Sequence, residues 1–262
     1  MCELVILQHH NSDLRTQISV HRSQTSELRI NMSLILQIET ATTSCSVALA
    51  AGGKVLDFKE VNERNRHAEV ITVFIEEILT AANLTYRDLD AIAVSCGPGS
   101  YTGLRIGIST AKGLCFALDK PLIAIETLEA MAYGVISDHR HLFDKNTLLC
   151  PMIDARRMEV YCALFSADGT KVRATAADII DENSFGEFLK HHKILFFGEG
   201  ADKCEALLGV NPNALFLPAY VNSATHLSQR ALQKFNEKEF EDVAYFEPYY
   251  LKDFIAGVKK QG

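Results

Sequence analysis

Basic side chains are not in excess in this sequence of 262 residues. Its 26 Lys and Arg residues stand against 33 Asp and Glu residues, which gives a net charge of −7. Proteins that hold nucleic acid alone depend on phosphate contacts from Lys and Arg. The charge balance therefore argues against a role as the main RNA-gripping subunit, although it leaves work beside RNA open.

Paired cysteines and long apolar runs are also lacking. The seven cysteines never form a C-x-x-C pair, and no Cys/His spacing is that of a zinc finger. Because the cysteines are scattered through apolar runs, they indicate reduced, buried thiols and a cytoplasmic protein. No apolar run reaches about 18 residues, so the sequence predicts no membrane segment.

The composition that is present suits a folded α/β chain. Apolar residues make up 48% of the sequence, enough at this length for one large or two small domains without disulfides or metal. Residues 1–31 have little apolar periodicity, whereas a patterned stretch starts at Met32. We expect 1–31 to be a poorly ordered extension or to lie upstream of the true start, with a targeting or docking arm as the alternative.

The patterned part of the chain repeats itself. A strand over 34–39 ends in Glu39, and strands over 47–51 and 55–61 follow; a strand over 148–153 ends in Asp154, and similar segments follow again. Each half continues with a helical segment, a strand, a glycine turn and a helix. We therefore predict two α/β lobes, 32–137 and 138–262, made by duplication. Chance similarity of two α/β halves is the alternative.

Two segments of the first half, 67–82 and 102–118, are more apolar than a helix on one sheet requires. The first has an apolar arc of roughly 180°, and the second has three glycines, each of which costs about 1 kcal/mol inside a helix. These helices are either deeply buried or they bind another chain. The candidate interface residues are Val70, Val73, Phe74, Gly103, Gly107, Thr110 and Ala111.

A glycine turn over 95–103 joins a predicted strand to the second helix. Gly97, Gly99 and Ser100 could bring backbone N–H groups to a phosphate at the helix N-terminus. However, no G-K-[ST] follows and the third glycine is misplaced for G-x-G-x-x-G. The alternative is a tight turn in which Ser100 or Thr102 caps the helix.

Polar residues follow the first strand of each half. Glu39 and Thr40 occupy the position at which a sugar-kinase or actin-like lobe holds its metal–phosphate acid, and Asp154 and Arg156 are the second-lobe counterpart. A capped strand end and a hairpin turn are the respective alternatives. His67 has Ile71 one helical turn later, so we expect a helix cap or a polar contact rather than a metal ligand. No catalytic set and no metal site are predicted.

Four segments together resemble the TsaB (YeaZ) family. They are ILQIETAT at 35–42, GPGSYTGLRIG at 97–107, DAR with EVY at 154–161, and PYYLK at 248–252. The resemblance runs in order from Met32 to about Lys252. It implies a duplicated actin-like fold of the sugar-kinase and Hsp70 class, which is ribonuclease H-like.

The resemblance also implies a function in tRNA threonylcarbamoyladenosine synthesis. The chain would be a non-catalytic subunit, with no activity expected alone, that orders a catalytic paralogue, TsaD, through the two first-lobe helices. TsaE would join the complex as an ATPase, and the complex would use ATP and Mg²⁺. This chain alone would bind no cofactor, and it would contact tRNA only indirectly. The family is grouped with M22-like peptidases, but this sequence shows no set of protease catalytic residues. The alternatives are a stand-alone actin-like ATPase or phosphotransferase, and a homodimer through the same helices.

Overall fold

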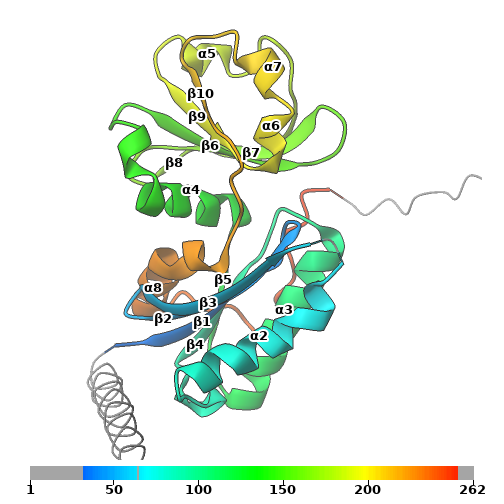
Figure 1. Ribbon diagram of the computed structural model, residues 1–262, viewed down its shortest axis with the longest axis vertical. Coiled ribbons are helices and arrows are strands. Elements are labelled where there is room, and N and C mark those ends of the chain that lie inside the picture. Colours follow the sequence, from blue (N-terminus) through cyan, green and yellow to red (C-terminus); the bar gives the residue numbers. More distant parts are fainter. Residues whose placement is uncertain (1–31, 64, 253–262) are drawn as a thin grey trace, which may run out of the picture.

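The computed structural model describes residues 32–63 and 65–252, so the expected extension 1–31 lies outside the described residues. Two lobes, each built on a five-stranded mixed sheet, stack along the long axis (Figure 1). The strands of the first sheet are β1 (Leu34–Glu39), β2 (Ser44–Ala51), β3 (Lys54–Asn62), β4 (Ala91–Ser95) and β5 (Leu122–Ile125). Those of the second are β6 (Leu148–Asp154), β7 (Glu159–Phe165), β8 (Lys171–Ile179), β9 (Ile194–Phe197) and β10 (Ala214–Leu217).

The two sheets have the same topology. The first has the order β3-β2-β1-β4-β5, and the second, read in the matching direction, has β8-β7-β6-β9-β10. In each, the first three strands are antiparallel neighbours and the last two add in parallel. The predicted duplicated, actin-like α/β fold is confirmed.

The helices differ between the lobes. In the first, α2 (His67–Ala81) and α3 (Tyr101–Leu118) lie side by side on one face of the sheet (Figure 1). At the equivalent places, the second lobe has only four-residue helices: α5 (Gly186–Leu189), α6 (Glu199–Asp202) and α7 (Glu205–Leu208). Short 3-10 helices η1 (Tyr86–Asp88) and η2 (Arg140–Leu142) lie in connections. The large helical layer therefore belongs to the first lobe.

The central strand β1 is buried along its whole length because both sheet faces are covered. Leu36 and Ile38 face the cluster that contains α2 and α3, while Ile35 faces the opposite cluster. Such a strand reads as a nearly continuous apolar run, which is what residues 34–38 show.

Two helices cross between the lobes. After β5, α4 (Thr127–Asp138) packs Leu128, Met131 and Val135 into a cluster with second-sheet residues. After β10, η3 (Ala224–Leu227) and α8 (Ser228–Glu237) pack against the free face of the first sheet. We expected the boundary between the lobes to lie between residues 137 and 138. Nearly all of α4 precedes this boundary in the sequence, yet it packs with the second sheet, and α8 follows the boundary, yet it packs against the first sheet.

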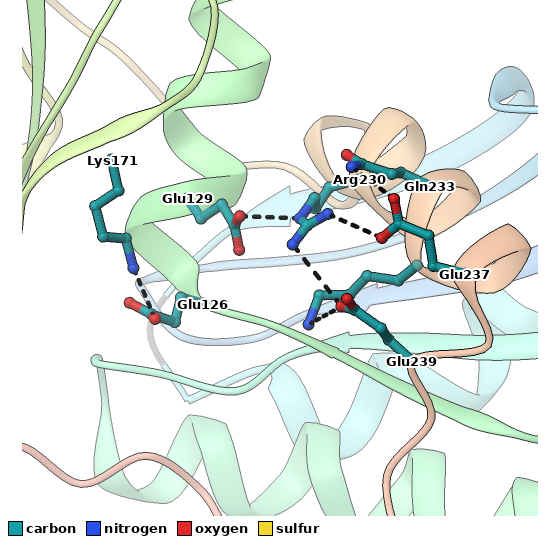
Figure 2. Close-up of polar contacts among 8 residues, drawn as sticks. Glu126, Glu129, Lys171, Arg230, Gln233, Glu237 and Glu239 are labelled. Atoms are coloured by element: carbon teal, nitrogen blue, oxygen red, sulfur yellow. Dashed lines mark hydrogen bonds and ion pairs between the residues drawn. The ribbon is translucent and has the colours of Figure 1, made fainter.

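A charged network lies where the crossing helices meet (Figure 2). Arg230 of α8 points to Glu129 of α4, with Nε 2.9 Å from Oε1, and both side chains are only 17% exposed. Glu237 and Glu239 also lie around Arg230, and Lys171 of β8 reaches Glu126 at 2.7 Å. This network ties elements of the two lobes together.

The last described segment of the chain returns to the first lobe. We call residues 239–252 the C-terminal strap. Its Glu241 N–H donates to the Leu122 carbonyl at 2.9 Å, and Lys112 of α3 donates to the Phe246 carbonyl at 2.8 Å. The strap ends at Lys252, which forms an ion pair with Glu159 of the second lobe. Across the described residues, no helix combines the length and apolarity needed to cross a membrane.

Candidate functional site

Glu39, at the end of β1, is fully buried rather than open to a ligand. Its Oε1 accepts the Ala41 N–H at 2.6 Å and the Ser95 hydroxyl at 2.8 Å. Burial raises the pKa of Glu39 from its ordinary 4.5 to about 6, against the opposing effect of these hydrogen bonds. The carboxyl group therefore organises the strand end, and its setting is that of a structural group.

The glycine turn after β4 is packed against its own chain. Gly97 has φ +119°, and a Cβ there would overlap with the Tyr249 carbonyl of the strap. A Cβ on Gly99 would overlap with the Ala41 carbonyl, and that same carbonyl accepts the Ser100 N–H at 2.6 Å. Ser100 also caps α3 by accepting the Gly103 N–H at 3.2 Å. The capped tight turn is thus the interpretation that these contacts support.

Close packing within this chain also explains two glycines of α3. A Cβ on Gly103 would overlap with the Thr40 carbonyl, and one on Gly107 would overlap with the Thr40 hydroxyl. Ala111 on the same face is fully buried. The face of α3 that carries Gly103, Gly107 and Ala111, for which burial and binding to a second chain were both open, is therefore turned toward the end of β1 in this chain. The close approach that explains Gly103 and Gly107 is internal.

The other members of the predicted interface set differ in their exposure. Val70 is buried, Phe74 is half-buried against the first-lobe core, and Val73 is 49% exposed on α2. Thr110 is half-buried and donates to the Ile106 carbonyl at 2.9 Å. Whether these side chains contact a partner stays a prediction.

Sequence reasoning missed the most exposed apolar side chain of this surface. Phe116 of α3 is 85% exposed. It follows Arg105, Ser109 and Lys112 at helical spacing of four, three and four residues, so a helical projection would have placed it on a polar stripe. The apolar ring of Phe116 on this otherwise polar stripe was the sequence signal that could have identified it as an exposed apolar side chain.

The second-lobe turn differs from the first-lobe strand end in its exposure. Asp154 is exposed, pairs with Lys203, and accepts the Arg156 N–H at 3.0 Å. Arg156 and Arg157 have φ of 74° and 50°, the left-handed region that non-glycine residues seldom adopt. The hairpin closed by Asp154 is confirmed as local geometry.

A cavity of about 280 Å³ separates the two strand ends. Polar residues of the first lobe, Thr42, Thr43 and Ser44, face it from one side, and Gly198, Glu199 and Asp202 of the second lobe from the other. Its lining carries carboxylates and, among the described residues, no Lys, Arg or His. A nucleotide phosphate, which actin-like folds imply, requires cationic or N–H donors. Within the part of the chain that the structure describes, this lining offers hydroxyl groups and carboxylates, and no cationic side chain, to a ligand.

The remaining candidates for metal chemistry are accounted for by packing. His67 is buried, with Nε2 3.0 Å from the Thr42 carbonyl, and Ile71 is buried in the core, as a polar-contact interpretation predicts. Within residues 32–63 and 65–252, no three His, Cys, Asp or Glu side chains are grouped as metal ligands would be. The six described cysteines are free and buried.

Known proteins share this architecture and these motifs. The family model described as "TsaD: tRNA N6-adenosine threonylcarbamoyltransferase" matches residues 60–259. The Escherichia coli protein named tRNA threonylcarbamoyladenosine biosynthesis protein TsaB is 33% identical over 245 residues, covering 87% of this chain and 98% of that protein. The chain belongs to the TsaB family.

Two further relatives show similarity to a solved structure and to a transferase. The solved structure named YeaZ from Pseudomonas aeruginosa is 26% identical, with a TM-score of 0.72 over 84% of this chain and 100% of that one. A Staphylococcus haemolyticus protein named tRNA N6-adenosine threonylcarbamoyltransferase is 41% identical over 118 residues, 39% of this chain and 34% of that protein. TsaB-family members and the transferase thus share part of one fold.

Proposed function

We propose that this chain is a non-catalytic subunit that supports transfer of the threonylcarbamoyl group to the adenosine next to the anticodon in tRNAs reading codons that begin with A. The observation that carries this proposal is a TsaB-family fold in which the acid at the end of β1 is fully buried. Glu39, the acid expected for phosphate chemistry, is enclosed by its own chain. Such a subunit acts through a partner rather than through its own cleft.

The partner in this proposal is a TsaD-like catalytic subunit that binds the outer face of α2 and α3. Val73 and Phe116 supply exposed apolar side chains there. In protein interfaces a few central side chains carry most of the binding energy, each costing about 2 kcal/mol or more when truncated. A TsaE-like ATPase joins the complex, and ATP with Mg²⁺ is used by the complex rather than held by this chain. Without the partner, the same face makes a homodimer. The buried, free thiols favour the reducing cytoplasm as the site of action.

Reconstitution tests this function. The tRNA modification is measured with the catalytic subunit, the ATPase and the threonylcarbamoyl donor, with and without this chain; formation of modified adenosine is expected only with it. Equal yield in its absence contradicts the proposal.

A pair of surface variants tests the binding face. Phe116→Asp should abolish co-elution with the catalytic subunit in size-exclusion chromatography, because a carboxylate would be desolvated in the interface. Val210→Asp is the matched control, since Val210 is 84% exposed in a second-lobe loop. If both variants co-elute like the wild type, the partner uses another face.

A further inference from the structure

Two neighbouring arginines of the second-lobe turn are held in a costly backbone conformation. Arg156 and Arg157 both have positive φ, at 74° and 50°. Left-handed backbone places a Cβ close to the following carbonyl, so glycine or asparagine normally occupies such positions. Both arginine side chains are exposed, and neither has an ion pair among the described residues. Strain retained under two unpaired cations points to a use for their charge.

The turn is joined to the first lobe by the C-terminal strap. The Glu159 N–H donates to the Arg156 carbonyl at 3.2 Å, and the Glu159 carboxylate pairs with Lys252 at the end of the strap. Two residues earlier, Tyr250 OH accepts from Arg105 Nε at 3.3 Å. A continuous set of contacts therefore runs from α3 across the strap to the turn.

Arg105 is held in place by two tyrosines. Its guanidinium lies 4.2 Å from the centre of the Tyr101 ring, and the rings of Tyr101 and Tyr250 are 5.0 Å apart. Cation–π contact and the hydrogen bond fix the guanidinium before any ligand arrives. The Tyr250 ring is itself 36% exposed beside it.

We call Arg105, Arg156, Arg157, Lys203 and Lys252 the basic rim. Two carboxylates lie within it, and each is matched by a lysine: Asp154 by Lys203 and Glu159 by Lys252. Three arginines are thus left without a carboxylate partner among the described residues. This is a local cationic surface in a chain whose net charge is −7.

We propose that the basic rim binds the phosphate backbone of single-stranded RNA in a tRNA loop. Planar guanidinium groups match phosphate oxygens with two parallel hydrogen bonds, and an exposed tyrosine beside them offers a face to an unpaired base. The inference rests on the proposed function, and it makes the contact with tRNA direct at this one place. An acidic protein surface would use the same cations but has no need of the exposed ring.

The test uses the complex of the full chain with its catalytic subunit and a fluorescein-labelled tRNA whose anticodon reads a codon beginning with A. Affinity is measured by fluorescence anisotropy between 50 and 200 mM KCl. The Arg156→Gly/Arg157→Gly variant should bind at least tenfold more weakly, and its slope of log affinity against log salt should be shallower by roughly 1.4, for two lost contacts of about 0.7 each.

Folding and charge are controlled separately. Glycine suits the left-handed backbone, so the thermal midpoint of the double variant should equal or exceed that of the wild type. Arg140→Gln/Lys145→Gln removes two exposed basic side chains elsewhere in the second lobe and should change affinity by less than threefold.

Four results would overturn the proposal that the basic rim binds RNA. The first two are an unchanged affinity and salt slope in the glycine variant, and an equal loss of affinity in the Arg140/Lys145 control. The others are a lower thermal midpoint that accounts for the loss, and loss of the protein complex while the tRNA affinity of the chain alone is unchanged. The last would assign these cations to a protein partner. If the wild-type chain forms no complex at all, the proposed function fails, and the same titration on the chain alone still decides the rim.

Discussion

The two lobes share one strand order but differ in the surroundings of their first strands and in the length of their helices. At the end of β1, Glu39 is fully buried and hydrogen-bonded to its own backbone; at the end of β6, Asp154 is exposed and paired with Lys203. The first lobe carries helices of 15 and 18 residues, whereas the second has four-residue helices in their place. Duplication preserved the sheet, and the surroundings of each strand end determine what that end can contact.

The glycine turns show what the lobes kept in common. Gly97 and Gly99 follow β4 and approach Tyr249 and Ala41, and Gly198 follows β9 and approaches the Met152 carbonyl. In each lobe the turn must pass within contact distance of the backbone at or just after the end of the neighbouring strand, β1 or β6. The repeat of glycines in the sequence therefore reports packing that both lobes require.

The largest expected effect on stability comes from comparing a glycine of the long first-lobe helix α3 with a glycine of the short second-lobe helix α5. Gly103→Ala should lower the free energy of unfolding by about 3 kcal/mol, because the new Cβ would overlap with the Thr40 backbone carbonyl. Gly186→Ala in α5 is the second-lobe control, since nothing lies within 4 Å of its added Cβ. Urea denaturation of both variants measures the difference, and equal losses would contradict the tight contact between α3 and β1.

The second effect concerns the pH dependence of the first strand end. The pKa of Glu39 is raised from 4.5 to about 6, so the native state binds more protons than the unfolded state between these values. The contribution of Glu39 to stability is then full below pH 4.5, and about 2 kcal/mol of it is lost as pH rises through 6. Denaturation of the wild type and of Glu39→Gln across pH 4–7 checks this.

The fall in stability between pH 4.5 and 6 should vanish in Glu39→Gln. Asp154→Asn, which alters the exposed counterpart in the second lobe, should retain it. Burial lowers the pKa of His226 to about 4, which makes stability rise with pH in the same window, so the difference between the wild type and Glu39→Gln is what isolates Glu39. A difference that does not change with pH would show that Glu39 is solvated, and the contrast between the two strand ends would disappear.

The third effect asks whether the lobes unfold together. Arg230→Met leaves Glu129 partly buried without its cation, since both side chains are 17% exposed. We expect a loss of about 1.5 kcal/mol. Lys238→Met, at an exposed residue of the same segment, is the control.

Differential scanning calorimetry reads out both Arg230→Met and its control. A single transition that moves as a whole indicates lobes coupled through α4 and α8. Two separated transitions in the wild type would instead show that the lobes unfold independently of each other.

Much of the fold could be predicted from the sequence because its signals are local. Apolar runs bounded by turns marked the strands, and the order of strands, helix and glycine turn revealed the duplication. The exchange of α4 and α8 could not be predicted, because it depends on which sheet face is left uncovered. An amphipathic helix does not encode the lobe that it covers.

The candidate site was only partly predictable for the same reason. Gly103 and Gly107 correctly indicated a close backbone approach, but their spacing does not tell an internal contact from an external one. The left-handed conformations of Arg156 and Arg157 had no signal at all, because the sequence there contains no glycine or asparagine.

The smallest effect separates the two faces of α3. Gly113 has nothing within 4 Å of an added Cβ, so Gly113→Ala should raise the free energy of unfolding by about 1 kcal/mol through the better helix propensity of alanine. Gly103→Ala in the same helix has the opposite sign, because there the added methyl group overlaps with Thr40. Urea denaturation resolves a difference of this size. A loss of stability in Gly113→Ala would mean that the outer face of α3 is packed rather than free for a partner.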